Sequence, residues 1–168
     1  PPSAAERAAP LRVRIRKATP ADIPTILGFI RDLALYEEAL EQAKATPELL
    51  QTNVFDKQYA HCLIAEQEED AQPVGMALYF FSFSTWEGKP SLYLEDLYVS
   101  PAARNRGAGK ALFRALGGVA EERGCARIDW SVLTWNAPSI AFYTQVLGAD
   151  MMQQWRTCRL EGEGIKKL

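Results

Sequence analysis

A short basic loop with two glycines is the part of the sequence best suited to hold an anion. The loop consists of Arg104, Asn105, Arg106, Gly107, Ala108 and Gly109. It follows an apolar segment, 91–99, and precedes 110–123, in which Leu112, Leu116 and Val119 mark a buried helical stripe. Where a strand leads into a helix, backbone N–H groups gather at the positive end of the helix dipole, and glycines let an anion approach them. The loop therefore predicts phosphate binding.

Two familiar phosphate-binding motifs do not account for this loop. A P-loop requires Ser or Thr after Gly-Lys, whereas Ala111 follows Gly109 and Lys110. A dinucleotide fingerprint requires a third glycine three residues beyond Gly109, where Leu112 stands. The alternative that stays open from the loop alone is an ordinary turn with solvated arginines.

Two adjacent acids, Glu95 and Asp96, interrupt the apolar segment before the loop. Because side chains of a strand alternate between its faces, we expect the two carboxylates to point to opposite faces. A carboxylate in a cleft can attract an ammonium group and accept its proton. His61 and Cys62 are also adjacent, so the same alternation argues against a base-activated thiol. Cys62 is predicted to be a buried residue.

The composition predicts a globular chain and excludes several classes of function. Of 168 residues, 48% are hydrophobic and 24% are charged, and a net charge of −2 gives no general attraction to nucleic acid or anionic membranes. The longest apolar run is much shorter than the roughly 20 residues that span a bilayer. The single histidine and the three scattered cysteines lack the spacing of a metal site. An odd, widely spaced set of cysteines is also typical of proteins in the reducing cytoplasm. We therefore expect a cytoplasmic protein with no metal.

The segments that must position these residues alternate between strand and helix. Strands are predicted over 12–18, 61–66, 73–83, 91–99, 126–133 and 155–160. Helices are predicted from Pro20 to about Leu40, from Pro47 to about Phe55, over 110–123 and from Pro138 to Val146. This order predicts one α/β domain over 12–168, with a mixed, mostly antiparallel sheet and helices on both faces. Residues 1–11 are expected to form a flexible leader.

Three motifs, in the order in which they occur, resemble the GNAT superfamily of acetyl-CoA-dependent N-acetyltransferases. They are 94–99 (LEDLYV), 104–109 (RNRGAG) and 136–139 (NAPS) followed by Phe142 and Tyr143. Four further segments are similar to the spermidine/spermine (diamine) group of that superfamily and to its thialysine-acetylating branch. They are 35–37 (LYE), 61–66 (HCLIAE), 86–89 (WEGK) and 93–96 (YLED). The resemblance covers residues 12 to 160 and implies a single-domain GNAT fold.

The resemblance implies acetyl-CoA as the cosubstrate and assigns its contacts to the loop and to segments on either side. The implied contact residues are Leu97, Tyr98, Val99, Arg104, Asn105, Arg106, Gly107, Ala108, Gly109, Lys110, Asn136, Pro138 and Ser139. Main-chain groups of 97–99 are expected to pair with the pantetheine arm, and one N–H to meet the oxyanion. Asn136 also precedes a helix start, where its side chain is equally suited to act as a cap.

Acetyl transfer from a thioester to an amine needs a neutral amine and a proton for the departing thiolate. The resemblance implies Glu95 as the base, acting directly or through a water. It implies Tyr143 as the acid, since a phenol of pKa about 10 can protonate a thiolate of pKa about 8.5. Asp96 is expected to be structural.

The amine substrate is implied to be a small cationic molecule. The resemblance implies that Tyr36, Glu37 and Glu95 bind it, and Trp86 is expected either to line the amine entrance or to belong to the core or a dimer surface. A second carboxylate across the cleft suits the distal charge of a diamine or polyamine. The segment 150–155 departs from the polyamine pattern, because Gln153 and Gln154 stand where acids are expected. Diamines, polyamines and thialysine-like compounds therefore all stay open as substrates.

Two other functions stay open at the level of the sequence. A protein or peptide amine acetyltransferase would share all the cofactor residues. A non-catalytic acyl-CoA sensor would use the same loop, although the presence of Glu95 and Tyr143 favours an enzyme. The resemblance also implies a homodimer.

Overall fold

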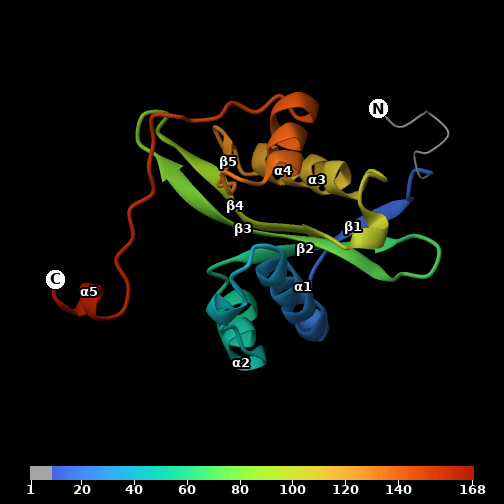
Figure 1. The fold of residues 1–168 in the computed structure, drawn as a ribbon, viewed down its shortest axis with the longest axis horizontal. Coiled ribbons are helices and arrows are strands. Elements are labelled where there is room, and N and C mark those ends of the chain that lie inside the picture. The colour runs from blue at the N-terminus through green and yellow to red at the C-terminus, as the bar shows by residue number, and fades with distance from the viewer. Residues whose placement is uncertain (1–8) are drawn as a thin grey trace. The chain divides into compact units, whose positions relative to one another are not determined.

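The computed structural model describes residues 9–168, which form a first compact unit that ends at Ser131 and a second that begins at Val132. The first unit contains β1 Val13–Lys17, α1 Ile23–Tyr36, α2 Pro47–Leu50, β2 His61–Gln67, β3 Pro73–Ser84, β4 Lys89–Val99, α3 Ala108–Glu122 and β5 Ile128–Trp130 (Figure 1). The second contains α4 Ala137–Ala141 and α5 Glu163–Lys166. Helices α2 and α4 continue as π-helical turns, Gln51–Asp56 and Phe142–Val146. Short 3-10 turns lie at Pro20–Asp22, Leu40–Gln42 and Pro101–Ala103.

The five strands form one mixed sheet in the order β1-β2-β3-β4-β5. The first three pairings are antiparallel, and the pairing of β4 with β5 is parallel. Helices α1 and α2 cover one face of the sheet, and α3 covers the other (Figure 1). The predicted α/β class, with a mostly antiparallel sheet between helices, is therefore confirmed.

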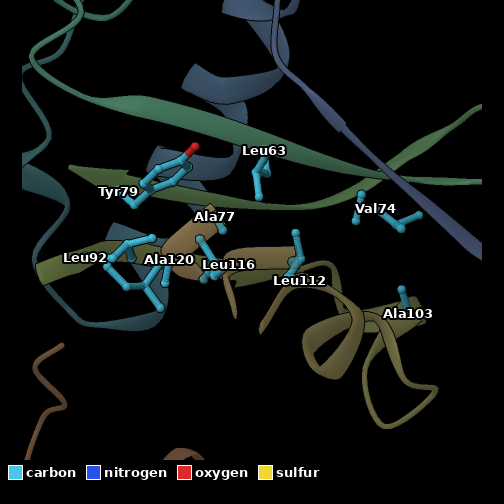
Figure 2. Close-up of a cluster of buried hydrophobic side chains, with 11 residues drawn as sticks. Leu63, Val74, Ala77, Tyr79, Leu92, Ala103, Leu112, Leu116 and Ala120 are labelled. Carbon is cyan, nitrogen blue, oxygen red and sulfur yellow. The ribbon is translucent and has the colours of Figure 1, made fainter. Parts of the chain in front are cut away.

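Alternating side chains of the strands build two hydrophobic cores, one on each face of the sheet. On β2, Leu63 packs on the side of α3, whereas Cys62 and Ile64 pack on the side of α1. Leu112 and Leu116 of α3 are fully buried against the sheet (Figure 2). Cys62 is buried as predicted, and its burial raises the pKa of the thiol to about 12, far above that of a reactive cysteine.

A β-bulge interrupts β4 at the pair of acids. Leu78 of β3 pairs with Asp96, whereas the next residue, Tyr79, pairs with Leu94, so Glu95 is the extra residue of the bulge. The alternation that separates Glu95 from Asp96 in a regular strand therefore does not hold here. A bulge bends its strand and increases the local twist, which turns the two halves of β4 in different directions.

The bulge also shifts the apolar pattern of β4 by one residue. Leu92 and Leu94 lie in the core on the α3 side, and so do Leu97 and Val99, although the spacing from Leu94 to Leu97 is three residues and not two. After the bulge, Tyr98 consequently joins the opposite core beneath α1. The acids thus lie where the strand changes its register.

A network of charges joins β1 and β2 to the start of α1. The guanidinium of Arg16 donates to both carboxylate oxygens of Asp22 at 2.8 Å, and the backbone N–H of Thr19 donates to Asp22 at 2.7 Å. Buried Glu66 accepts from both Arg16 and Arg14. The hydrogen bond from Arg16 is the main reason why the pKa of Asp22 is lowered to about 2.

Asp22→Asn is expected to lower the free energy of unfolding by about 2 kcal/mol at pH 7, because a carboxylate pKa lowered from 3.8 to about 2 stabilises the folded state by that order. This contribution is present above pH 4 and is lost as the pH falls towards 2. Urea denaturation at several pH values measures it. Asp129→Asn, which removes an exposed partner of Arg127, is the control and should cost about 0.5 kcal/mol or less. Equal losses for the two variants would contradict the account.

The second unit differs most from the sequence prediction. The strand predicted over 155–160 is absent, and residues 150 to 163 are all exposed. The alternation of 155–160 is that of a strand, but a strand also needs a hydrogen-bonded neighbour, and none of the five described strands pairs with this segment. The prediction of a sixth strand is therefore wrong for the chain as described, and the strand predicted over 126–133 is shortened to Ile128–Trp130.

The predicted leader lies partly outside the described residues, which begin at residue 9. Residues 9–11 contact the loop before α3. Leu11 donates its backbone N–H to the carbonyl oxygen of Arg106 at 2.9 Å, and Arg106 Nε donates to the Ala9 carbonyl oxygen at 2.9 Å. Leu11 also packs against the core on the α3 side, so this part of the chain belongs to the fold.

Candidate active site

The loop before α3 has the backbone geometry of an anion site. Asn105 and Gly107 both have left-handed backbone angles, with φ of 58° and 98°, and Gly107 is the N-cap residue of α3. Glycine adopts this conformation without strain. Gly107 has no side chain to cap the helix, and no other described side chain does so. The first N–H groups of a 15-residue helix are therefore available to a negatively charged ligand.

Basic side chains surround this helix start. A hollow of about 510 Å³ beside it is lined by Arg12 of the chain before β1, by Arg106 of the loop and by Lys110 and Arg114 of α3. One acid, Glu68, also lines it. Arg12 and Arg114 are not among the residues predicted from the sequence. The spacing of four residues between Lys110 and Arg114, which places both on one helix face, was the available signal for Arg114.

These residues fit a diphosphate group. An uncapped helix end, two left-handed residues that orient successive N–H groups and an excess of positive charge are the elements of a phosphate site. Nothing lies within 4 Å of the position that a Cβ atom would take at Gly107, so the approach to the backbone is open there. The contacts that the sequence analysis assigns to 104–110 stay predictions.

The second half of β4 has an open edge. In the part of the chain that the structure describes, β5 pairs with β4 only at Leu92, Tyr93 and Leu94. From the bulge onward, β4 is paired with β3 on one side alone, which leaves main-chain groups of 97–99 on the other side for an extended ligand. Tyr98 turns its ring into the core. The predicted main-chain contacts therefore have an edge at which to form.

Three carboxylates from two elements come together near this edge. Glu37, at the end of α1, and the two acids of the bulge, Glu95 and Asp96, are close enough for Glu95 and Glu37 to raise the pKa of Asp96. Burial is the largest cause, and together these effects raise that pKa to about 6. Burial also raises the pKa of Glu37. A group of acids whose charges oppose one another is complementary to a cation.

Asp96 is predicted from the sequence to be structural, but its raised pKa makes it a candidate functional residue. No local pattern could have indicated the raised pKa of Asp96, because Glu37, one of its causes, lies 59 residues earlier in the chain. The signal that did exist was the apolar spacing of three between Leu94 and Leu97, which predicts a bulge at the acids.

Asp96→Asn is expected to stabilise the protein and to weaken its binding of an amine. At pH 8 the variant should gain about 3 kcal/mol in the free energy of unfolding, because it avoids burying a charge whose pKa is raised from 3.8 to about 6. The wild type loses this stability as the pH rises from about 4 to above 6, so the two proteins should be equal at pH 4. Urea denaturation at pH 4 and pH 8 measures the difference. An unchanged or lower stability at pH 8 would contradict the assignment.

The other predicted substrate residues lie in different places. Tyr36 is at the end of α1, with the guanidinium of Arg104 5.3 Å from its ring centre. It thus lies beside the loop and next to Glu37. Trp86 is 87% exposed at the tip of the β3–β4 hairpin. Lys89 and Glu95 are six positions apart along the strand, which is about 20 Å, so the structure does not bring Trp86 to the acids.

The second unit carries the remaining predicted residues. The side chain of Asn136 accepts from the backbone N–H of Ser139 at 3.3 Å, and Pro138 lies in the first turn of α4. This confirms the cap role of Asn136, while its contact with the cofactor stays a prediction. Tyr143 is half-buried in the π-helical turn after α4, and its ring lies 5.6 Å from that of Phe142.

Known proteins are similar to this chain in both sequence and fold. The profile of the acetyltransferase (GNAT) family matches residues 28–149. The chain is 36% identical to the thialysine N-epsilon-acetyltransferase of Bos taurus, with 93% of this chain and 96% of that protein covered. It is 34% identical to the spermidine/spermine N(1)-acetyltransferase-like protein 1 of Homo sapiens, with 90% of this chain and 23% of that protein covered. The solved structure of an integron cassette protein from V. cholerae matches with a TM-score of 0.75 at 26% identity, and the match covers 92% of this chain and 96% of that one.

Proposed function

Because the chain belongs to the acetyltransferase (GNAT) family, we propose that it transfers acetyl from acetyl-CoA to a primary amine of a small cationic metabolite. The transfer is a direct attack within a ternary complex. One observation carries the proposal. The open edge of β4 lies between an uncapped, basic helix start and a group of three carboxylates. The anionic donor and the cationic acceptor thus have complementary surfaces at the two ends of one strand segment.

The loop and β4 hold the donor in this mechanism. The N–H groups at the start of α3, with Arg106 and Lys110 beside them, bind the diphosphate. Main-chain groups of 97–99 bind the pantetheine arm as an added strand would be bound. When bound, the thioester supplies an activated acetyl carbon. A backbone N–H at the β4 edge stabilises the negative charge that develops on the carbonyl oxygen.

The carboxylates hold and activate the acceptor. A free alkylamine has a pKa of about 10.4, so only about 1 molecule in 1,000 is neutral at pH 7. Glu95, exposed on the bulge, accepts the proton of the ammonium group, directly or through a water. Asp96 and Glu37 hold the positive charge of the substrate. Tyr143 of the second unit gives a proton to the departing thiolate.

The substrate class follows from the charges. Three carboxylates favour an acceptor that keeps a second positive charge after its amine has lost a proton. Thialysine and spermidine or spermine, which the names of similar proteins mention, both meet this condition. Gln153 and Gln154 are exposed and neutral, so nothing in 150–155 adds a further acid for a long polyamine beyond Asp150. A thialysine-like compound or a short diamine is therefore the proposed acceptor.

A panel of amines tests this function. Release of free coenzyme A thiol is measured with acetyl-CoA and, in turn, thialysine, short diamines, spermidine, spermine, an aminoglycoside and a lysyl peptide. The proposal expects the largest kcat/KM with thialysine or a short diamine. A preference for the peptide would favour a protein acetyltransferase. Binding of acetyl-CoA without release of thiol for any amine would favour the sensor and contradict the proposal.

We also propose that the protein acts in the cytoplasm as a homodimer. Its three cysteines are free thiols, as is typical of a reducing compartment. The dimer is supported by the exposed segment after α4, in which Met152, Trp155 and Leu160 are each 60% exposed or more. Exposed apolar side chains gathered in one segment are typical of protein interfaces.

If the protein is a homodimer, light scattering should give a mass in solution of twice the 18.7 kDa of one chain. Trp155→Asp with Leu160→Asp should shift the protein to the monomer, because charges would enter an apolar interface. Tyr59→Asp, at an equally exposed aromatic residue of the first unit, is the control and should leave the mass unchanged. A monomeric wild type would contradict this part of the proposal.

A further inference from the structure

The chain immediately before β1 holds the loop before α3 at one residue, Arg106. The backbone N–H of Leu11 donates to the carbonyl oxygen of Arg106 at 2.9 Å. The side chain of Arg106 donates from Nε to the carbonyl oxygen of Ala9 at 2.9 Å and from Nη1 to that of Ala102 at 3.4 Å. Segment 9–11 therefore contacts both the backbone and the side chain of this loop residue, and the two segments lie side by side in Figure 1.

Leu11 is itself fixed to the fold. Its side chain packs against the core on the α3 side. The carbonyl oxygen of the next residue, Arg12, accepts a hydrogen bond from the backbone N–H of Glu68 at 3.1 Å. Strand β1 then begins at Val13 and pairs with β2. The N–H of Leu11 is therefore held in place by packing and by the edge of the sheet.

The hydrogen bond from Leu11 also sets the direction of the N–H of Gly107. The carbonyl of Arg106 and the N–H of Gly107 belong to one planar peptide unit, and in a trans peptide the two groups point in opposite directions. Because the carbonyl is turned towards Leu11, the N–H of Gly107 points away from it. Gly107 is the N-cap residue of α3, so its N–H is the first of the donors at the helix start.

This peptide unit lies between two residues with left-handed backbone angles. Glycine adopts positive and negative φ about equally, so its residue type alone does not fix the φ of 98° at Gly107. Asn105, with a φ of 58°, has a conformation that few residues other than glycine adopt. Such conformations persist only where surrounding contacts determine them. The contacts of Arg106 with segment 9–11 are contacts of this kind.

We propose that the backbone N–H of Leu11 is a positioning group for the donor, which keeps the N–H of Gly107 directed at the diphosphate. This inference rests on the proposed function. Leu11 acts through the loop. Without its N–H, the peptide unit between Arg106 and Gly107 can rotate, and a carbonyl oxygen then faces the phosphate in place of an N–H. An oxygen repels the anion, so segment 9–11 controls the affinity for acetyl-CoA and not the chemical step.

The size of the effect follows from the hydrogen bond that is lost. A hydrogen bond between neutral groups corresponds to about a two- to tenfold change in an equilibrium constant. The apparent Kd of a ligand rises as the fraction of protein in the binding conformation falls. Loss of the Leu11 N–H should therefore raise the Kd of coenzyme A and the KM for acetyl-CoA by about two- to tenfold. The kcat should stay within about twofold, since Glu95 and Tyr143 are unchanged.

Calorimetry with free coenzyme A, combined with urea denaturation, tests the inference on the full chain. Leu11→Pro removes the N–H. The hydroxy acid analogue of leucine, placed at position 11, replaces only the N–H group by an oxygen and does not constrain the backbone as proline does. Both variants should raise the Kd by the stated factor. Leu11→Ala is the matched control, because it keeps the N–H and shortens the side chain. It should unfold at a lower urea concentration and keep the wild-type Kd.

A role for Leu11 in stability alone would give a different order of effects. Leu11→Ala would then raise the Kd at least as much as the hydroxy acid analogue does. That order, or an unchanged Kd in the hydroxy acid variant, would overturn the inference while thiol release by the wild type still upheld the proposed function. A wild type that binds no coenzyme A would overturn both.

Discussion

Tyr143→Phe is expected to lower kcat by about a hundred- to a thousandfold while leaving the Kd of acetyl-CoA within about twofold of the wild type. The substitution removes the phenolic proton that is proposed to neutralise the thiolate. It keeps the aromatic ring that packs beside Phe142, so the π-helical turn should retain its structure. Steady-state thiol release gives kcat, and calorimetry gives the Kd.

Tyr59→Phe is the control for this prediction. Tyr59 is 68% exposed and far in sequence from every proposed site residue, so its hydroxyl should not matter. A Tyr143→Phe variant that turns over at the wild-type rate would remove Tyr143 from the mechanism. A large loss of acetyl-CoA affinity would instead indicate that the hydroxyl binds the donor.

Glu95→Gln is expected to lower kcat/KM for the amine by about a hundredfold at pH 7, because glutamine cannot accept the proton of the ammonium group. The variant should depend on the small neutral fraction of the amine. Its rate should therefore rise about tenfold for each pH unit up to the amine pKa of about 10.4. The wild type should show a plateau over part of this range. The pH dependence of kcat/KM from pH 6 to pH 10 measures the difference.

Glu87→Gln, at the turn of the same hairpin, is the control and should keep the wild-type profile. The comparison with Asp96→Asn is informative, since Asp96 is the neighbouring acid and has a raised pKa. If Asp96→Asn lost the plateau and Glu95→Gln kept it, the base would be Asp96, and the role given to Glu95 would be wrong.

Much of the first unit could be predicted because its signals are local. The start of the first helical segment follows from Thr19, Pro20 and Asp22, and in the structure the backbone N–H of Thr19 donates to the carboxylate of Asp22 at 2.7 Å. The predicted ranges of β2 and β3 agree with the structure to within one residue, since their apolar runs are long and bounded by polar segments. The loop before α3 was found because glycines at a helix start have a distinct physical role.

The features that were missed depend on partners far away in the chain. The alternation of 155–160 describes a segment able to form a strand, but it does not provide the neighbouring strand that would complete the hydrogen bonds. The state of Asp96 depends on Glu37, and the direction of Arg104 depends on Tyr36. Each of these pairs is separated by more than 50 residues, so neither is visible in a short window of sequence.

The central claim is that the start of α3 binds the diphosphate of acetyl-CoA, and calorimetric titration with acetyl-CoA tests it most directly. The account predicts one site per chain and at least a tenfold weaker Kd for Gly107→Val, because a branched residue is strained at a φ of 98° and its side chain would occupy the approach to the backbone. Gly88→Val, at a turn with a φ of 63° away from the loop, should keep the wild-type Kd. No heat of binding from the wild type, or equal affinity for Gly107→Val, would contradict the claim.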